Sequence, residues 1–202
     1  EFNINPSAKM SRYCYAGQVL HTLPDSFAGS RNPLQIGAEL FGHEGPESDV
    51  EVITLLLEVL SVAGIQEPNL ELGDMGLFRG ICDLANFDEN QEELVLGSLL
   101  KKNVEEIKVL LESFSIDEKV QELFLSLLKL NGTTEVLKDA AKAFVNGPVE
   151  LQKAVESLEE LVHLLHIRNP NLAIGIDLAE LKGYRYHSST TFSVYTPSAG
   201  RA

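Results

Sequence analysis

The sequence predicts an α+β fold: an antiparallel sheet with flanking helices, interrupted by a helical insertion. Short runs of alternating apolar and polar residues, rich in aromatic and β-branched types, occur near both ends of the chain. Between them, residues 88–168 are rich in Leu, Glu and Lys and show no strand-like alternation. The 202 residues are 44% hydrophobic, enough to bury a core. We therefore expect a core formed by residues 1–87 and 169–202, with an insertion at 88–168.

The first part of the chain contains two predicted strands followed by a helix. Tyr13–Leu20 and Leu34–Phe41 alternate as strands do, and a Gly/Pro/Ser-rich connection joins them. Ser48 or Asp49 can cap a helix that Gly64 ends. The remaining elements expected here are a short strand and a helix, at Asn69–Leu72 and from Leu77 onward.

The insertion is predicted to hold five short helices: Gln91–Lys101, Val104–Ser113, Asp117–Leu128, Thr134–Phe144 and Val149–His166. Their boundaries fall at Asn and Gly residues, including Asn131-Gly132. Leu123 and Leu127 should face the insertion's core, so polar replacements there should be costly. After the insertion, Asn171–Asp177 and Gly183–Phe192 are expected to be the last two strands.

Composition limits the classes of function. The formal net charge of −14 argues against unassisted binding to nucleic acid, which depends on clustered Lys and Arg. No apolar run has the length of a membrane span and no signal sequence starts the chain, so the protein is expected to be soluble and cytoplasmic. Cys14 and Cys82 lie in apolar segments without a metal-binding pattern and are predicted to be buried, reduced thiols.

A pair of histidines is a candidate metal site. His163 and His166 are spaced i, i+3 on a predicted helix, which could bring both to one side. No third ligand is evident, because Glu159 and Glu160 fit ordinary surface charges. We therefore expect no metal, and no other cofactor.

Polar side chains on the second predicted strand indicate a binding face. In Leu34–Phe41, alternation places Gln35, Gly37 and Glu39 on the same side. An amide and a carboxylate on one face can clamp a ligand ammonium group. The alternative is a solvated strand face with no ligand.

The two strands and their connection resemble motif 2 of a class II aminoacyl-tRNA synthetase, specifically of histidyl-tRNA synthetase. The residues that carry this resemblance are YAGQVLHT, residues 15–22, and QIGAELFG, residues 35–42. The resemblance implies a class II synthetase-type sheet, in which Gln35 and Glu39 contact bound histidine. His21 stands where these enzymes carry a phosphate-binding arginine.

A second segment near the end resembles the synthetase signature that closes over the histidine side chain. Gly183 and Tyr186 match the glycine and the first tyrosine, whereas Lys182 replaces an arginine and His187 replaces the second tyrosine. By resemblance the histidine-binding set is therefore Gln35, Glu39, Lys182, Tyr186 and His187. Since arginine supplies a permanent charge and a bidentate fork, its replacement at His21 and Lys182 implies that adenylation activity is lost.

From about Arg12 to Tyr195 the chain is most similar to the regulatory subunits of ATP phosphoribosyltransferase, synthetase-like paralogues of histidine biosynthesis. The resemblance implies a non-catalytic subunit that partners the short-form catalytic subunit, binds L-histidine and self-associates through a synthetase-like dimer. The family's motif 1 would precede this sequence and motif 3 would follow it, so we expect a fragment. The alternatives are a catalytic-domain fragment of a divergent histidyl-tRNA synthetase and a synthetase-like module with another amino-acid ligand.

Overall fold

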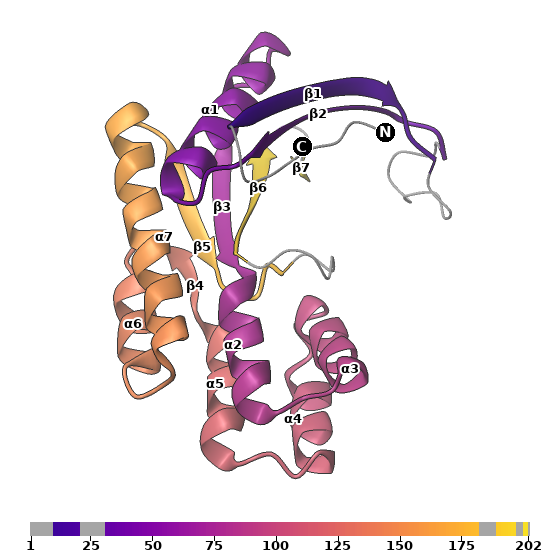
Figure 1. The fold of residues 1–202 in the computed structure, drawn as a ribbon, viewed down its shortest axis with the longest axis vertical. Helices are drawn as coiled ribbons and strands as arrows, with labels where there is room; N and C mark the ends of the chain where they lie inside the picture. Colours follow the sequence, from indigo (N-terminus) through magenta and orange to yellow (C-terminus); the bar gives the residue numbers. More distant parts are fainter. Residues whose placement is uncertain (1–9, 21–30, 182–188, 197–199, 202) are drawn as a thin grey trace. The chain divides into compact units, whose positions relative to one another are not determined.

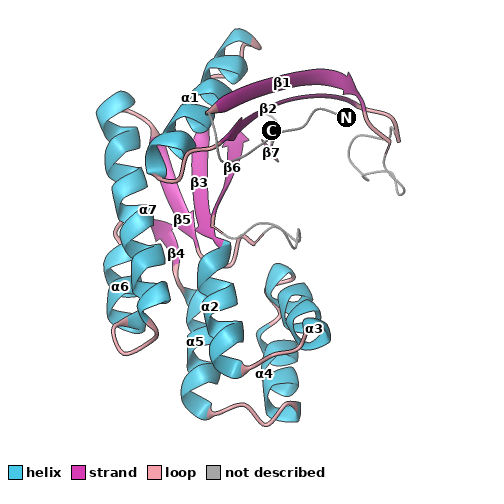
Figure 2. Cartoon of the chain, in the orientation of Figure 1, coloured by secondary structure: helices cyan, strands magenta, loops and turns pink. Residues whose placement is uncertain are grey.

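The computed structural model describes residues 10–20, 31–181, 189–196 and 200–201, which fall into two compact units, 1–58 and 59–202. Helices and strands mix along the chain, and this confirms the predicted α+β class (Figure 2). The predicted segment boundaries at 87/88 and 168/169 stay predictions. In the described part of the chain, no helix is both long and apolar enough to cross a membrane.

The first unit is built on a β-hairpin. Strands β1 (Ser11–Gln18) and β2 (Leu34–Phe41) pair antiparallel over their whole length. Helix α1 (Pro46–Val62) follows, two residues earlier than its predicted cap, because Pro46 suits the first turn and Glu47 and Asp49 complement the helix dipole. The helix ends as predicted, with Gly64 at φ +81.

The second unit contains a five-stranded sheet in the order β4-β5-β3-β6-β7 (Figure 1). Strand β3 (Asn69–Asp74) is central, parallel to β5 (Ala173–Asp177) and antiparallel to β6 (Thr190–Thr196). The sheet is thus antiparallel except for its β3–β5 pair. Two short strands, β4 (Asn131–Thr133) and β7 (Gly200–Arg201), form its edges.

Helix α2 (Met75–Ala85) continues directly from β3. Asp74 caps it by accepting a hydrogen bond from the Gly76 amide at 2.6 Å, and Asn86 ends it in the left-handed conformation. Just before the cap, a Cβ on Gly73 would lie 2.8 Å from the carbonyl oxygen of Asp177. Only glycine therefore lets the end of β5 approach β3 this closely.

The described part of the second unit holds five further helices: α3 (Glu89–Leu100), α4 (Val104–Ser113), α5 (Glu118–Lys129), α6 (Val136–Phe144) and α7 (Val149–Arg168). Their predicted positions are confirmed to within two residues at each end. Asp88 and Gln91 form a capping box at α3, and Asn103 and Asp117 cap α4 and α5. Helix α7 packs on α2 and β3, and α6 packs on α7.

Three aromatic rings pack together as an aromatic cluster, one from helix α2, one from the segment just after it and one from helix α5. Phe87 stacks on Phe124 with ring centroids 5.5 Å apart, and Phe78 meets Phe124 edge to face at 6.1 Å. Leu127 is fully buried, as predicted, but Leu123 is only half-buried. The buried stripe of α5 therefore runs through Phe124 and Leu127, which are three residues apart, and not through Leu123.

Two strand predictions differ from the structure. Asn131-Gly132, predicted as a boundary between helices, forms β4, which is too short to show a sequence period and exists through pairing with β5. Of the last strand, predicted at Gly183–Phe192, residues 183–188 lie outside the described residues, and the described part belongs to β6, which spans Thr190–Thr196 and so extends four residues further than predicted. Its register against β3 sets this position, with Thr190 opposite Asp74 and Tyr195 opposite Asn69.

Candidate functional site

The hairpin of the first unit carries one polar, aromatic face. In the register of β1 and β2, Tyr13 lies opposite Glu39, Tyr15 opposite Gly37 and Gly17 opposite Gln35. Since opposite residues share a face, Gln35 and Glu39 stand on the same side of the hairpin, as the alternation predicts. Both side chains are exposed. Their role in binding histidine stays a prediction.

Tyr15 occupies the middle of this face, and its role was missed in the sequence. Its hydroxyl accepts a hydrogen bond from Gln35 Nε2 at 2.9 Å. Its ring lies over Gly37, where a Cβ would be 2.4 Å from Tyr15 Cζ. A glycine inside a strand between two polar residues was the available signal, because it marks a close approach by another group.

The other face of the hairpin is turned toward α1. The Arg12 guanidinium binds both carboxylate oxygens of Glu51, with Nη2 donating to Oε2 at 2.7 Å, and this hydrogen bonding raises the pKa of Arg12. A small hollow of about 150 Å³ lies here, and Cys14 and Leu55 are among its lining residues. Cys14 is exposed, so the prediction that it is buried is wrong. The reason is that most of β1 is solvent-exposed along its length.

The remaining residues of the predicted histidine-binding set cannot be placed. Lys182, Tyr186 and His187 lie outside the described residues, as does His21. The structure therefore brings Gln35 and Glu39 onto one face and leaves the other three predicted residues without a position.

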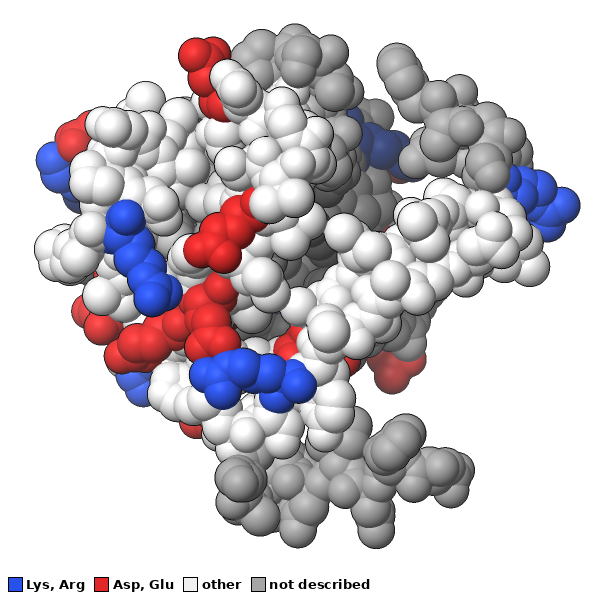
Figure 3. All heavy atoms as spheres, turned by 90° about the horizontal axis from the view of Figure 1, so that it is seen from above, with Lys and Arg blue, Asp and Glu red and all other residues white. Residues whose placement is uncertain are grey.

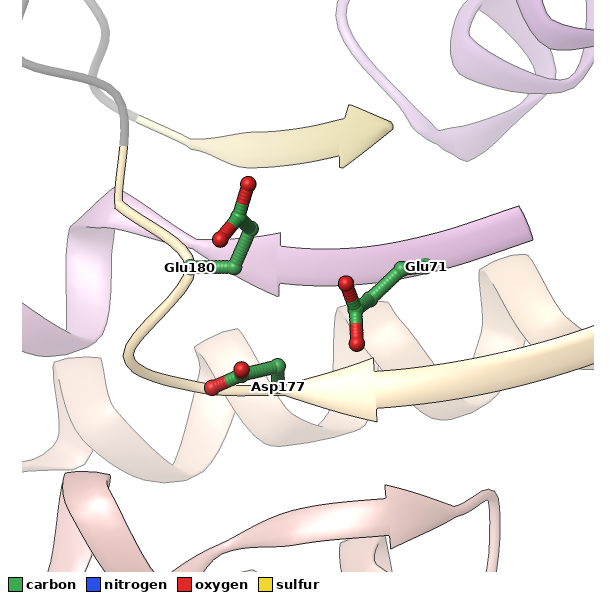
Figure 4. Close-up of side chains that lie close together, drawn as sticks. All are labelled: Glu71, Asp177 and Glu180. Atoms are coloured by element: carbon green, nitrogen blue, oxygen red, sulfur yellow. The ribbon is translucent and has the colours of Figure 1, made fainter. Parts of the chain in front are cut away.

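Three carboxylates converge in the second unit, at the end of β5 (Figure 4). Glu71 comes from β3, Asp177 ends β5 and Glu180 follows it, and their carboxylate oxygens lie within 4.8 Å of one another. Lys102 donates to Asp177 Oδ2, and this bond raises the pKa of Lys102. Tyr195 donates to Glu180 Oε1 at 3.4 Å.

The carboxylate cluster changes the pKa of Glu71. Burial raises the pKa of its carboxyl, and repulsion from Asp177 and Glu180 raises it further. Carboxylate oxygens are ligands that hard divalent cations prefer. Lys102 already supplies a positive charge here, so we assign no ion.

The two candidate metal-binding histidines are not part of this cluster. Within the described ranges, Glu71, Asp177 and Glu180 are the group of three potential ligand side chains that lie close enough for an ion. His163 is exposed on α7. Cys82, by contrast, is buried as predicted, and burial raises the pKa of its thiol.

Acidic and basic side chains lie next to one another on the face of the molecule drawn in Figure 3. In helices α4 and α6, Glu105 pairs with Lys108 at 3.2 Å and Asp139 with Lys142 at 2.8 Å. Such exposed pairs contribute little to stability.

The mixed sheet and the hairpin define a domain of the class II aminoacyl-tRNA synthetase type. An ATP phosphoribosyltransferase regulatory subunit/histidyl-tRNA synthetase from Bacillus halodurans has the same fold, with a TM-score of 0.80 at 20% identity over 96% of this chain and 50% of that chain. A chain of the ATP phosphoribosyl transferase (HisG:HisZ) complex from Thermotoga maritima gives a TM-score of 0.70 at 21% identity, over 96% of this chain and 66% of that chain.

The chain belongs to the histidyl-tRNA synthetase family, whose sequence model matches residues 3–202. Two curated relatives are each named ATP phosphoribosyltransferase regulatory subunit. The one from Teredinibacter turnerae is 40% identical over 95% of this chain and 49% of its own length. The one from Nitrosococcus oceani is 39% identical over 96% of this chain and 48% of its own length. The chain thus spans about half the length of these relatives.

Proposed function

We propose that this chain is part of a non-catalytic regulatory subunit of ATP phosphoribosyltransferase, the first enzyme of histidine biosynthesis. The observation that carries the proposal is the identity of 39–40% with relatives of that name, over 95–96% of the chain. The Thermotoga maritima neighbour is a chain of such an enzyme complex, which supports a short-form catalytic subunit as the partner. The assembly would be cytoplasmic and include a synthetase-like dimer of regulatory subunits.

The proposed ligand of the regulatory subunit is L-histidine. Glu39 offers a carboxylate to the ligand ammonium group, and Gln35 adds a directional hydrogen bond from the same face. Lys182, Tyr186 and His187 belong to the proposed binding set through the family resemblance alone. Histidine would regulate the enzyme by linkage, since it lowers activity only if it favours the inhibited assembly over the active one.

Reconstitution of the complex tests the partner. The full-length protein is mixed with a short-form catalytic subunit that has little activity alone, and both complex formation and phosphoribosyl transfer are measured. We expect a stable complex, restored activity and inhibition by histidine. A full-length protein that neither binds nor activates the catalytic subunit of its own cell would contradict the proposal.

Calorimetric titration tests the ligand. Glu39→Gln should weaken histidine binding to the full-length protein by about 1.5–3 kcal/mol, the range for a hydrogen bond to a charged group. Glu44→Gln, an exposed carboxylate just beyond β2, is the matched control and should leave the affinity unchanged. An affinity unaffected by both Glu39→Gln and Tyr186→Phe would place the ligand elsewhere than between these two segments.

A synthetase fragment remains the second candidate, because the family model that matches the chain is that of histidyl-tRNA synthetase. His21 and Lys182 oppose it, since a synthetase of this family would present arginine at both positions. The two candidates differ in whether the full-length protein forms histidyl-adenylate.

A further inference from the structure

The Tyr15 ring and Gly37 fit each other across the hairpin. A Cβ on residue 37 would lie 2.4 Å from both Cζ and the hydroxyl oxygen of Tyr15, far inside van der Waals contact. The phenol therefore lies across β2 at residue 37, in the space that a Cβ would occupy. Residue 37 is midway between Gln35 and Glu39, about 7 Å along the strand from each.

The position of the phenol fixes the direction of the Gln35 side chain. Gln35 Nε2 donates to the Tyr15 hydroxyl at 2.9 Å, so the head group of Gln35 is drawn toward residue 37. Glu39 stands on the far side of that residue, on the same face. With its nitrogen bound to Tyr15, the amide has its carbonyl oxygen left to accept a hydrogen bond from a ligand.

We infer that Tyr15 is a positioning residue: it holds the Gln35 amide, so that the Gln35 carbonyl oxygen accepts from the same ligand ammonium group as the Glu39 carboxylate. A carbonyl oxygen only accepts hydrogen bonds, so the Gln35 oxygen can bind an N–H of a ligand ammonium group but not a ligand carboxylate. The inference rests on the proposed function, because histidine supplies the ammonium. The competing explanation is that the bond between Tyr15 and Gln35 only braces the hairpin.

Histidine titrations of Tyr15→Phe, Gln35→Ala and the double variant, all in the full-length protein, measure this coupling. Phenylalanine keeps a ring over Gly37 and removes only the hydroxyl. Because one neutral hydrogen bond contributes about 1 kcal/mol, Tyr15→Phe should weaken binding about three- to tenfold. In the Gln35→Ala background the same change should have no effect, since the amide to be positioned is gone.

A comparison of two ligands distinguishes a positioning role of Tyr15 from a role that only braces the hairpin. 3-(Imidazol-4-yl)propionate lacks the α-ammonium group of histidine, so it does not depend on the proposed acceptor pair. Tyr15→Phe should therefore reduce the ratio of the two affinities by the same three- to tenfold. Tyr13→Phe is the matched control: Tyr13 lies on the same face but packs edge to face on Phe41, with ring centroids 6.0 Å apart, and the ratio should not change.

Each outcome decides between the explanations. Equal losses for both ligands, or an undiminished loss in the Gln35→Ala background, would assign Tyr15 to bracing and overturn the inference. If Glu39→Gln weakens histidine binding and Tyr15→Phe does not, the inference about Tyr15 is wrong and the proposed function is unaffected. If the wild-type protein binds no histidine, with or without the catalytic subunit, the inference falls together with the histidine part of the proposed function, while reconstitution still tests the regulatory assignment.

Discussion

At the residue scale, the functions of acidic side chains depend on what surrounds them. Glu39 stands exposed on a hairpin face, where its charge is available to a ligand. Glu71 shares its surroundings with Asp177 and Glu180, and its neighbours on the same face in β5 and β6 are Gly175 and Ser193, too small to separate it from them. Burial and repulsion therefore raise the pKa of Glu71.

This raised pKa predicts a pH dependence of stability. The folded chain binds the Glu71 proton more tightly than the unfolded chain does. Its contribution to the free energy of unfolding is therefore greatest below the ordinary value of 4.5 and is lost as pH rises through the folded pKa. Glu71→Gln removes the charge, so we expect it to raise the free energy of unfolding at pH 7.5 more than at pH 4.5. Urea unfolding at the two pH values measures the difference.

Lys102→Met gives the opposite test in the same cluster. It removes the cation that binds Asp177, so it should lower stability at pH 7.5 more than at pH 4.5. If neither variant changed the pH dependence, the carboxylates would not interact strongly in the folded protein.

At the element scale, the close contact between β3 and the end of β5 requires a glycine, Gly73, at the end of β3. A Cβ on Gly73 would meet two backbone oxygens, those of Asp177 and Glu180, at 2.8 and 3.0 Å. Backbone cannot rotate away as the end of a flexible side chain can. Gly73→Ala should therefore lower the free energy of unfolding by about 1–3 kcal/mol, the usual cost of overpacking.

Gly97 provides the matched substitution. It lies inside α3, and a Cβ added to it would meet no neighbouring atom within 4 Å. Gly97→Ala should therefore raise the free energy of unfolding by about 0.5–1 kcal/mol, because alanine loses less conformational freedom in a helix. Chemical denaturation of both variants checks the pair, and equal effects would contradict the close approach at Gly73.

The packing of α5 gives a second test at this scale. Leu127 is fully buried beside the aromatic cluster, whereas Leu123 is half-buried. Leu127→Asn should cost about 2–4 kcal/mol of unfolding free energy, and Leu123→Asn clearly less. Similar losses for both variants, measured by thermal or urea unfolding, would mean that the buried face of α5 is the one expected from the sequence alone.

At the scale of the whole molecule, the decisive property is whether the protein performs adenylation. The full-length protein should show no ATP–pyrophosphate exchange with histidine above background, because His21 and Lys182 stand where arginines are expected. An authentic histidyl-tRNA synthetase assayed in parallel is the positive control. Clear exchange would contradict the regulatory assignment and support the synthetase alternative.

Local patterns in the sequence determined the α+β class, most element positions and the shared face of Gln35 and Glu39. This is possible because the periods of strands and helices are set by the backbone itself. Helix α4 and strand β2 have the predicted bounds for the same reason. The family resemblance, carried by the segments around Gln35 and Gly183, also needed only the sequence.

Only the tertiary structure decided the features that depend on partners distant in the chain. Strand β4 exists because it pairs with β5, and the bounds of β6 follow from its register against β3. The exposure of Cys14, the hydrogen bond between Tyr15 and Gln35, and the meeting of Glu71 with Asp177 each join or expose residues in ways that no local period encodes. Such contacts arise from packing between elements, so the spacing of residues along the chain cannot predict them.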